Sequence, residues 1–144
     1  MSNKFVANGF STALPQGWLD RSVISLVNPN VSSGFATNVV VLREEVAPHT
    51  SIEKYSQDQL AQIQTDLEDF QILDARATTI HGKPAYQSLH RFTANERSLQ
   101  QAQTYILSDN TIFAFTCTAP VEEFDRSIPA FREIMDNLSF ADEL

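Results

Sequence analysis

The sequence predicts an α+β domain built from consecutive antiparallel strands and two helices. The predicted strands follow one another in runs separated by turn residues, unlike the alternating strands and helices of a βαβ chain. Helices are predicted at 48–70 and 121–137, where apolar residues recur at helical spacing. The chain has 144 residues, of which 42% are hydrophobic and ten are Phe, enough for one buried core. Residues 1–144 contain no repeat, linker or low-complexity segment, so they are predicted to form a single domain.

The first part of the chain is predicted to contain three strands, at 5–12, 20–27 and 35–44. A turn separates the first two strands, because Pro15 fixes φ and Gly17 permits a positive φ. The third strand contains the unbroken apolar run 39–42, which is typical of a strand covered on both faces. A helix, a second sheet or a partner must therefore cover each side of this strand.

The rest of the chain is predicted to contain four further strands between the two helices, at 72–80, 85–92, 99–107 and 111–118. Thr50 and Glu53 have the spacing of a capping box at the start of the first helix. Asp109 and Asn110 fit a short hairpin loop. Pro129 is expected to kink the second helix or delay its start, and residues 138–140 are expected to add a short last strand.

The charge of the chain restricts its partners. The formal net charge of −8 makes nucleic acid and an anionic membrane surface poor partners, because both attract clustered Lys and Arg. No stretch is long and apolar enough for a transmembrane helix, so no stable membrane insertion is expected. The N-terminus lacks the pattern of a signal peptide, and a single cysteine cannot form an intramolecular disulfide. The cytoplasm is therefore the expected compartment.

The sequence offers no constellation of residues that indicates catalysis. Its three His residues are not spaced as metal ligands, and its four Gly residues are too dispersed for a phosphate-binding loop. Cys117 lies among Phe residues, where a free cysteine usually packs as a small buried hydrophobe. The expectation is a protein that binds another protein, with no enzymatic activity, no cofactor and no metal.

Two glutamine-bearing surfaces suggest a binding site. One face of the strand at 99–105 would carry Leu99, Gln101, Gln103 and Tyr105. One face of the first helix would carry Gln59, Ile63 and Leu67. The pattern fits either an ordinary amphipathic helix over a sheet or a groove for a hydrophobic segment, whose polar atoms Gln could bind.

Six segments in this order resemble the DcrB-related family. The opening turn at 14–22, LPQGWLDRS, resembles the family pattern LP-x-GW-x-D-x-S. The other five segments are the strand at 38–44, the helix at 55–70, the turn at 82–85 (GKPA), the strand at 101–105 and the Phe131-Arg132 pair. The resemblance covers nearly the whole chain.

Chains of this length in the family resemble the Eag chaperones of type VI secretion systems. That resemblance implies a PsbP-like fold, an antiparallel β-sheet sandwich flanked by two helices, in a protein that is commonly a homodimer. It also implies a function, namely holding the hydrophobic N-terminal transmembrane helices of a PAAR- or Rhs-containing effector before export. We call this effector the client. The alternative is a non-catalytic binding module or assembly factor of the same fold.

The resemblance also implies a set of client-binding residues. Carried over by position, they are Val23, Ser25, Val40, Gln59, Ile63, Leu67, Leu99 and Gln103. The sequence departs from the family at Ser25, where an aliphatic residue is expected, although a serine could form a hydrogen bond with the client.

Overall fold

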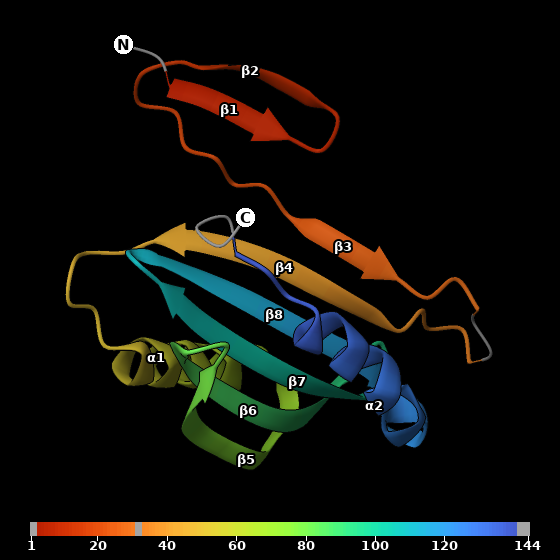
Figure 1. Cartoon of the computed structure of the whole chain (residues 1–144). Helices are drawn as coiled ribbons and strands as arrows, with labels where there is room; N and C mark the ends of the chain where they lie inside the picture. Colours follow the sequence, from red (N-terminus) through yellow and green to blue (C-terminus); the bar gives the residue numbers. More distant parts are fainter. Residues whose placement is uncertain (1–2, 31–32, 141–144) are drawn as a thin grey trace.

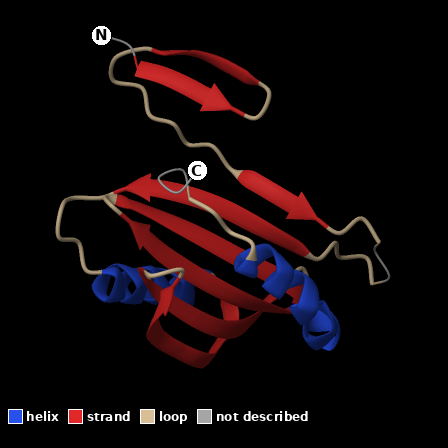
Figure 2. Cartoon of the chain, in the orientation of Figure 1, coloured by secondary structure: helices blue, strands red, loops and turns tan. Residues whose placement is uncertain are grey.

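The computed structural model describes residues 3–30 and 33–140 and confirms the α+β class. One six-stranded antiparallel sheet carries a helix on each side, and a two-stranded hairpin lies apart from it (Figures 1 and 2). The elements are β1 (Asn3–Ala7), β2 (Phe10–Leu14), β3 (Ile24–Val27), β4 (Asn38–Glu45), α1 (Ile52–Asp66), β5 (Glu68–Ile80), β6 (Lys83–Ala94), β7 (Arg97–Ser108), β8 (Thr111–Pro120) and α2 (Val121–Asp136).

The large sheet has the strand order β3-β4-β8-β7-β6-β5. Strands β5 to β8 form a meander of successive hairpins, as the turn residues predicted. Asp109, in the predicted hairpin loop, has a φ of 54°, a conformation that Asp tolerates better than most residues. Strand β4 returns to pair with β8, from Asn38 opposite Thr118 to Glu45 opposite Thr111. Strand β3 is added outside β4 and is one edge of the sheet.

The two helices cover opposite faces of this sheet. On one face, Phe124 and Phe131 of α2 pack with Val39, Cys117 and Ala119. On the other face, the ring of Tyr55 in α1 lies edge-on to that of Tyr105 in β7, with centroids 5.7 Å apart. In the β7–β8 register Tyr105 lies opposite Ala114, which is three residues before Cys117 in β8 and so lies on the other face. Since side chains alternate between faces along a strand, Tyr105 and Cys117 point to opposite sides.

The first helix is shorter than the sequence predicted, and its cap differs by one residue. The side chain of Ser51, not Thr50, accepts a hydrogen bond from the Lys54 backbone N–H at 3.2 Å. Thr50 donates its hydroxyl to Ala47 O in the preceding turn. The helix ends before the predicted limit because Leu67 is extended and Glu68 already pairs with Thr93 in the sheet.

The N-terminal strands also differ from the prediction. The segment at 5–12 is not one strand but a hairpin that reverses at Gly9, whose φ is 95°. The second predicted strand, 20–27, is reduced to β3 at Ile24–Val27, because only these residues pair with β4.

The C-terminal helix begins at Val121 and contains Pro129, so the proline does not delay its start. Residues 138–140 form no strand, contrary to the prediction. Phe140 instead packs its ring 5.2 Å from that of Phe113 and lies under the Lys83 ammonium group.

Candidate binding groove

Helix α1 covers only part of its side of the sheet. It packs on β5, β6 and β7, and no described helix packs on the same face of β3 and β4. The contrast is clearest in β4, where Val39 beneath α2 is 2% exposed and Leu42 on the open face is 46% exposed. The prediction that this strand is covered on both faces therefore holds for one face within the chain. On the other face, no helix or second sheet from residues 3–30 or 33–140 packs on this strand.

A cavity of about 220 Å³ lies where α1 meets this open face. We call it, together with the adjoining open surface of β3 and β4, the groove. Its lining residues come from the loop before β3, from α1 and from β4, β7 and β8: Arg21, Ser22, Leu42, Arg43, Glu44, Tyr55, Gln59, Ile63, Gln103, Tyr105, Ile112, Ala114 and Thr116.

The floor of the groove is mainly aliphatic or small and uncharged. Val40 lies opposite Ser25 on one side and Thr116 on the other, so these three side chains share the open face. Leu42 and Ala114 continue the same face one pair further along. A floor of this kind can bury an apolar surface without desolvating a charge.

A row of polar side chains crosses the sheet beside the floor. Gln103 donates from Nε2 to Thr116 Oγ1 at 3.2 Å, and Gln101 donates from Nε2 to Thr118 Oγ1 at 2.9 Å. Gln101 Oε1 therefore accepts from Nε2 of His90 at 2.8 Å. Burial of His90 lowers its pKa, although the hydrogen bond to Gln101 opposes the shift, so the ring is neutral at pH 7.

Several buried polar atoms under α1 have no hydrogen-bond partner among the described residues. They are Ser56 Oγ, Ser88 Oγ, His90 Nδ1 and Gln103 Oε1. A buried polar atom without a partner typically costs about 1–3 kcal/mol, and native proteins contain few of them. Gln103 lines the cavity and is 9% exposed. Its Oε1 is shielded from solvent, so a donor entering the groove could satisfy this acceptor only if the neighbouring side chains moved.

The charged residues of the groove are grouped at one end. The Tyr55 hydroxyl donates to Glu44 Oε2 at 2.7 Å, which joins α1 to β4. Burial raises the pKa of Tyr55, and the hydrogen bond to the Glu44 carboxylate raises it further. The hydroxyl is therefore a permanent donor at physiological pH.

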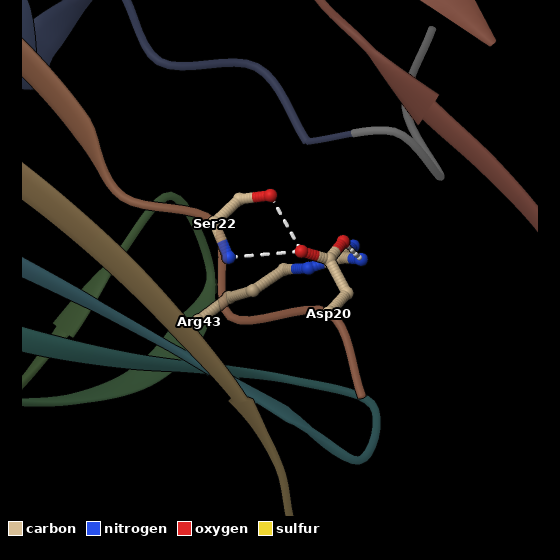
Figure 3. A network of polar contacts seen from close by, with 3 residues as sticks. All are labelled: Asp20, Ser22 and Arg43. Carbon is tan, nitrogen blue, oxygen red and sulfur yellow. Dashed lines mark hydrogen bonds and ion pairs between the residues drawn. The ribbon is translucent and has the colours of Figure 1, made fainter. Parts of the chain in front are cut away.

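The loop before β3 is fixed at the same end. Arg43 forms an ion pair with Asp20 at 2.8 Å, and Asp20 Oδ1 accepts hydrogen bonds from both the hydroxyl and the backbone N–H of Ser22 (Figure 3). The bonds from Ser22, with the contribution of Arg43, hold the pKa of Asp20 below its ordinary value. This network links the segment before β3 to β4.

The structure brings together some of the residues proposed from the sequence. Gln59, Ile63 and Gln103 line the cavity. Ser25 and Val40 lie on the adjoining floor. Val23 precedes β3 and is 62% exposed.

The other two proposed residues occupy different surroundings. Leu67 is the half-buried residue at the end of α1. Leu99 is only 5% exposed and belongs to the core. A client could not reach Leu99 unless the surrounding residues moved.

Sequence reasoning missed Leu42, Ala114 and Thr116. The signal for Leu42 was available, because it follows Val40 by two residues in one strand and must share its face. Ala114 and Thr116 required the pairing of β4 with β8, which no local pattern indicates.

Two larger cavities, of about 580 and 730 Å³, lie beside α2. The first includes Glu123 and Arg126 in its lining. The second includes Asp74, Arg76, Arg132 and Asp136. Charged side chains line all three cavities, and the groove differs from the other two in adjoining the exposed apolar side chain of Leu42 on β4.

The one cysteine of the chain lies in the core. Cys117 is 4% exposed, and burial raises its pKa to about 11. No group of three or more His, Cys, Asp or Glu in the described ranges could hold a metal ion. None of the described helices is both long enough and apolar enough to cross a membrane.

A single antiparallel sheet with a helix on each face, and a hairpin set apart from it, places the chain among the α+β folds. The DcrB family model matches residues 11–137. The chain therefore belongs to the DcrB family. No protein of curated function matches its sequence.

Solved structures show the same fold. Protein PA94 of Pseudomonas aeruginosa, of unknown function and described as a candidate regulator, is 19% identical with a TM-score of 0.83 over 96% of each chain. LpqN of Mycobacterium tuberculosis, involved in cell envelope biogenesis, is 16% identical with a TM-score of 0.62 over 82% of this chain and 80% of its own. Cyanobacterial PsbP (CyanoP) from Synechocystis sp. PCC 6803 is 11% identical with a TM-score of 0.53, over 90% and 86%. At these identities the likeness establishes the fold alone.

Proposed function

We propose that the chain is a cytoplasmic, non-catalytic chaperone that holds the hydrophobic N-terminal transmembrane helices of a type VI secretion effector of the PAAR or Rhs type. The observation that carries the proposal is the uncovered face of β4, where Val40 and Leu42 form an apolar floor beside α1. An apolar client helix laid on this floor would remove it from water, at roughly 25 cal/mol per Å² of apolar surface buried. The resemblance of this chain to the Eag chaperones of the DcrB-related family supports the same function.

The row of polar side chains beside the floor, which includes Gln103, would let the groove favour a transmembrane helix over other apolar segments. Faces of such helices that pack closely are rich in Gly, Ala, Ser and Thr. A client hydroxyl could donate to Gln103 Oε1, which has no partner among the described residues. Binding would then satisfy a buried acceptor at the same time as it buries apolar surface.

A homodimer fits the same proposal. Two copies would present two grooves and could hold two helices of one client, which gains avidity from the effective concentration of the second site. This arrangement keeps the client's apolar segments out of the wrong membrane until export.

Affinity capture from the producing bacterium tests the proposal with a matched pair of variants. Leu42→Asp places a charge on the groove floor, and Ile72→Asp places a charge on β5. The two side chains are almost equally exposed, Leu42 at 46% and Ile72 at 44%. We expect wild type and Ile72→Asp to retain a protein with N-terminal transmembrane helices and a PAAR or Rhs region, and Leu42→Asp to lose it. Capture of soluble partners alone, or equal capture by Leu42→Asp, would favour a different binding module of this fold.

A further inference from the structure

Helix α1 is held to the sheet by less buried apolar surface than α2. Only Ser56 and Leu60 among its fifteen residues are buried. Helix α2 buries the rings of Phe124 and Phe131, which pack in a core cluster with residues of β4 and β8. Most of the stability of a helix in a protein comes from the packing of its apolar face. Of the two helices, α1 is therefore the one that separates from the sheet at the smaller cost.

The contact between α1 and the sheet also contains polar atoms that face each other without bonding. On the helix, Ser56 Oγ has no hydrogen-bond partner among the described residues. On the sheet, the same holds for Ser88 Oγ, His90 Nδ1 and Gln103 Oε1. Ser88 lies opposite Gln103 and two residues from His90, so the three side chains share the face that α1 covers. All four residues are at most 9% exposed, and native proteins contain few such atoms.

One side-chain hydrogen bond ties the described part of α1 to the sheet. It is the bond from the Tyr55 hydroxyl to Glu44 Oε2, near the start of the helix. Later polar side chains of the helix bond within it, as Gln62 does to Asp66. The helix is therefore fastened to β4 at its N-terminal end, with no such bond towards its C-terminal end.

The two segments that join α1 to the sheet have the features of hinges. His49 before the helix and Asp69 after it both have a positive φ, of 66° and 54°. Leu67 is already extended, and the β5–β6 register shifts between Glu68 and Gln71, so Asp69 has no partner in the ladder. Residues at the end of an element that are not held in a ladder can absorb the change in φ and ψ that a moving element requires.

Lifting α1 would uncover apolar as well as polar side chains. Phe92 and Leu99 lie opposite each other on the face that α1 covers, and they are 6% and 5% exposed. Water would satisfy the polar atoms without partners, but these two side chains would be left in water. The closed position is therefore the major one until another apolar surface covers Phe92 and Leu99.

We infer that α1 is a lid, which lifts from the sheet as a client binds, so that Ser88, His90 and Leu99 join Gln103 in the client site. A client helix would cover the apolar side chains, and its hydroxyl groups would bond to the polar atoms, so it binds the open position better and shifts the population towards it. The inference rests on the proposed function for the identity of the ligand. The motion of the lid is a property of the chain alone.

Hydrogen exchange of the full chain without a client, followed by mass spectrometry, tests the lid by itself. Amides of α1 should exchange at least tenfold faster than those of α2. Ser56→Ala and Ser88→Ala should each slow exchange in α1 by about tenfold, because each removes a hydroxyl that is unsatisfied only in the closed position. Tyr55→Phe should speed it, since it releases the bond to Glu44. Ser127→Ala is the control, because its hydroxyl bonds to Glu123 O within α2.

A second measurement connects the lid to binding. The probe is a synthetic peptide of about 20 Leu, Ala and Ser residues, the length of a transmembrane helix, flanked by Lys for solubility. Ser56→Ala and Ser88→Ala should each bind it about tenfold more weakly than wild type, although neither variant is less stable. Ser127→Ala should bind it as wild type does.

The outcomes separate the lid from the proposed function. Exchange in α1 as slow as in α2 would overturn the lid, even if the peptide binds. Faster exchange in Ser56→Ala and Ser88→Ala would also overturn it, because the hydroxyls would then have partners such as buried water in the closed position. Fast exchange in α1 that both variants slow, without binding of the peptide or capture of a client, would leave the lid standing and remove the proposed function.

Discussion

The hydroxyl of Tyr55 in α1 lies 2.7 Å from Oε2 of Glu44 in β4, and this hydrogen bond joins the helical wall of the groove to its floor. Because α1 makes its other contacts with β5, β6 and β7, the bond spans the width of the groove at its charged end. The ring of Tyr55 also packs edge-on against the ring of Tyr105 in β7.

Tyr55→Phe should lower the free energy of unfolding by about 1 kcal/mol, since it removes one hydrogen bond and keeps the ring contact with Tyr105. Chemical denaturation measures the loss. In a double-mutant cycle with Glu44→Ala, the two losses should not add, because either variant alone removes the bond. Fully additive losses would mean that the bond contributes nothing to stability.

Gln103→Met should separate stability from binding. The variant removes both the buried Oε1 without a partner in the described chain and the bond from Nε2 to Thr116, two effects of opposite sign, so the free energy of unfolding should change little. Client capture should fall by about tenfold or more, in line with the loss of about 1.4 kcal/mol. Gln101→Met is the control, because it breaks the bonds to His90 and Thr118 and should destabilise the fold.

His90 should make stability depend on pH on the acid side. Its folded pKa lies below the ordinary value of 6.5, so below pH 6.5 the unfolded state binds a proton that the folded state resists. Stability is therefore fully present above pH 6.5 and is lost as pH falls towards the folded pKa, by at most about 1.4 kcal/mol per pH unit. Urea denaturation of wild type and His90→Gln measures the slope. An equal slope in both proteins would assign it to other groups.

Cys117 should resist alkylation in the folded protein. Burial raises its pKa to about 11, so at about pH 8 little thiolate exists and the sulfur is also shielded. Iodoacetamide should label the chain in guanidinium chloride and leave native protein unlabelled. Rapid labelling of the native protein would show that α2 opens readily, since Phe124 and Phe131 cover this side of β8.

Leu99→Ala should act mainly on stability, because the side chain is only 5% exposed. A loss of about 2–5 kcal/mol is expected for truncation of a buried leucine. Leu67→Ala, at the half-buried end of α1, should lose less. Thermal unfolding of both variants makes the comparison. If Leu99→Ala were stable but failed to capture the client, Leu99 would belong to the binding surface after all.

Much of the fold followed from local patterns. The β5–β8 meander was predictable because turn residues such as Asp109 and Gly82 separate strands that pair with their sequence neighbours. The hairpin at the N-terminus was missed although Asn8-Gly9 is a strong hairpin signal. The error arose because the apolar alternation on either side of it was read as continuous.

The remaining misses had tertiary causes. Helix α1 was expected to continue to Phe70, but Glu68 already joins the sheet, and the ring of Phe70 lies tilted against that of His90, with centroids 4.9 Å apart. Gln59, Ile63 and Gln103 were found from their periodicity, and the cavity unites them. Leu99 has the same periodicity as Gln103, and no pattern in its own strand could distinguish a core position from a groove position.

The pairing of β4 with β8 has a consequence for how the protein assembles. Asn38 pairs with Thr118 across the whole intervening meander, whereas β5 to β8 pair with their immediate neighbours. Contacts of high sequence separation form slowly because a long loop must close first. During synthesis the ribosome would release β4 long before its partner strand, so the groove floor is the last part of the sheet to be completed. Destabilising changes at the β4–β8 seam should therefore accelerate unfolding more than they slow folding.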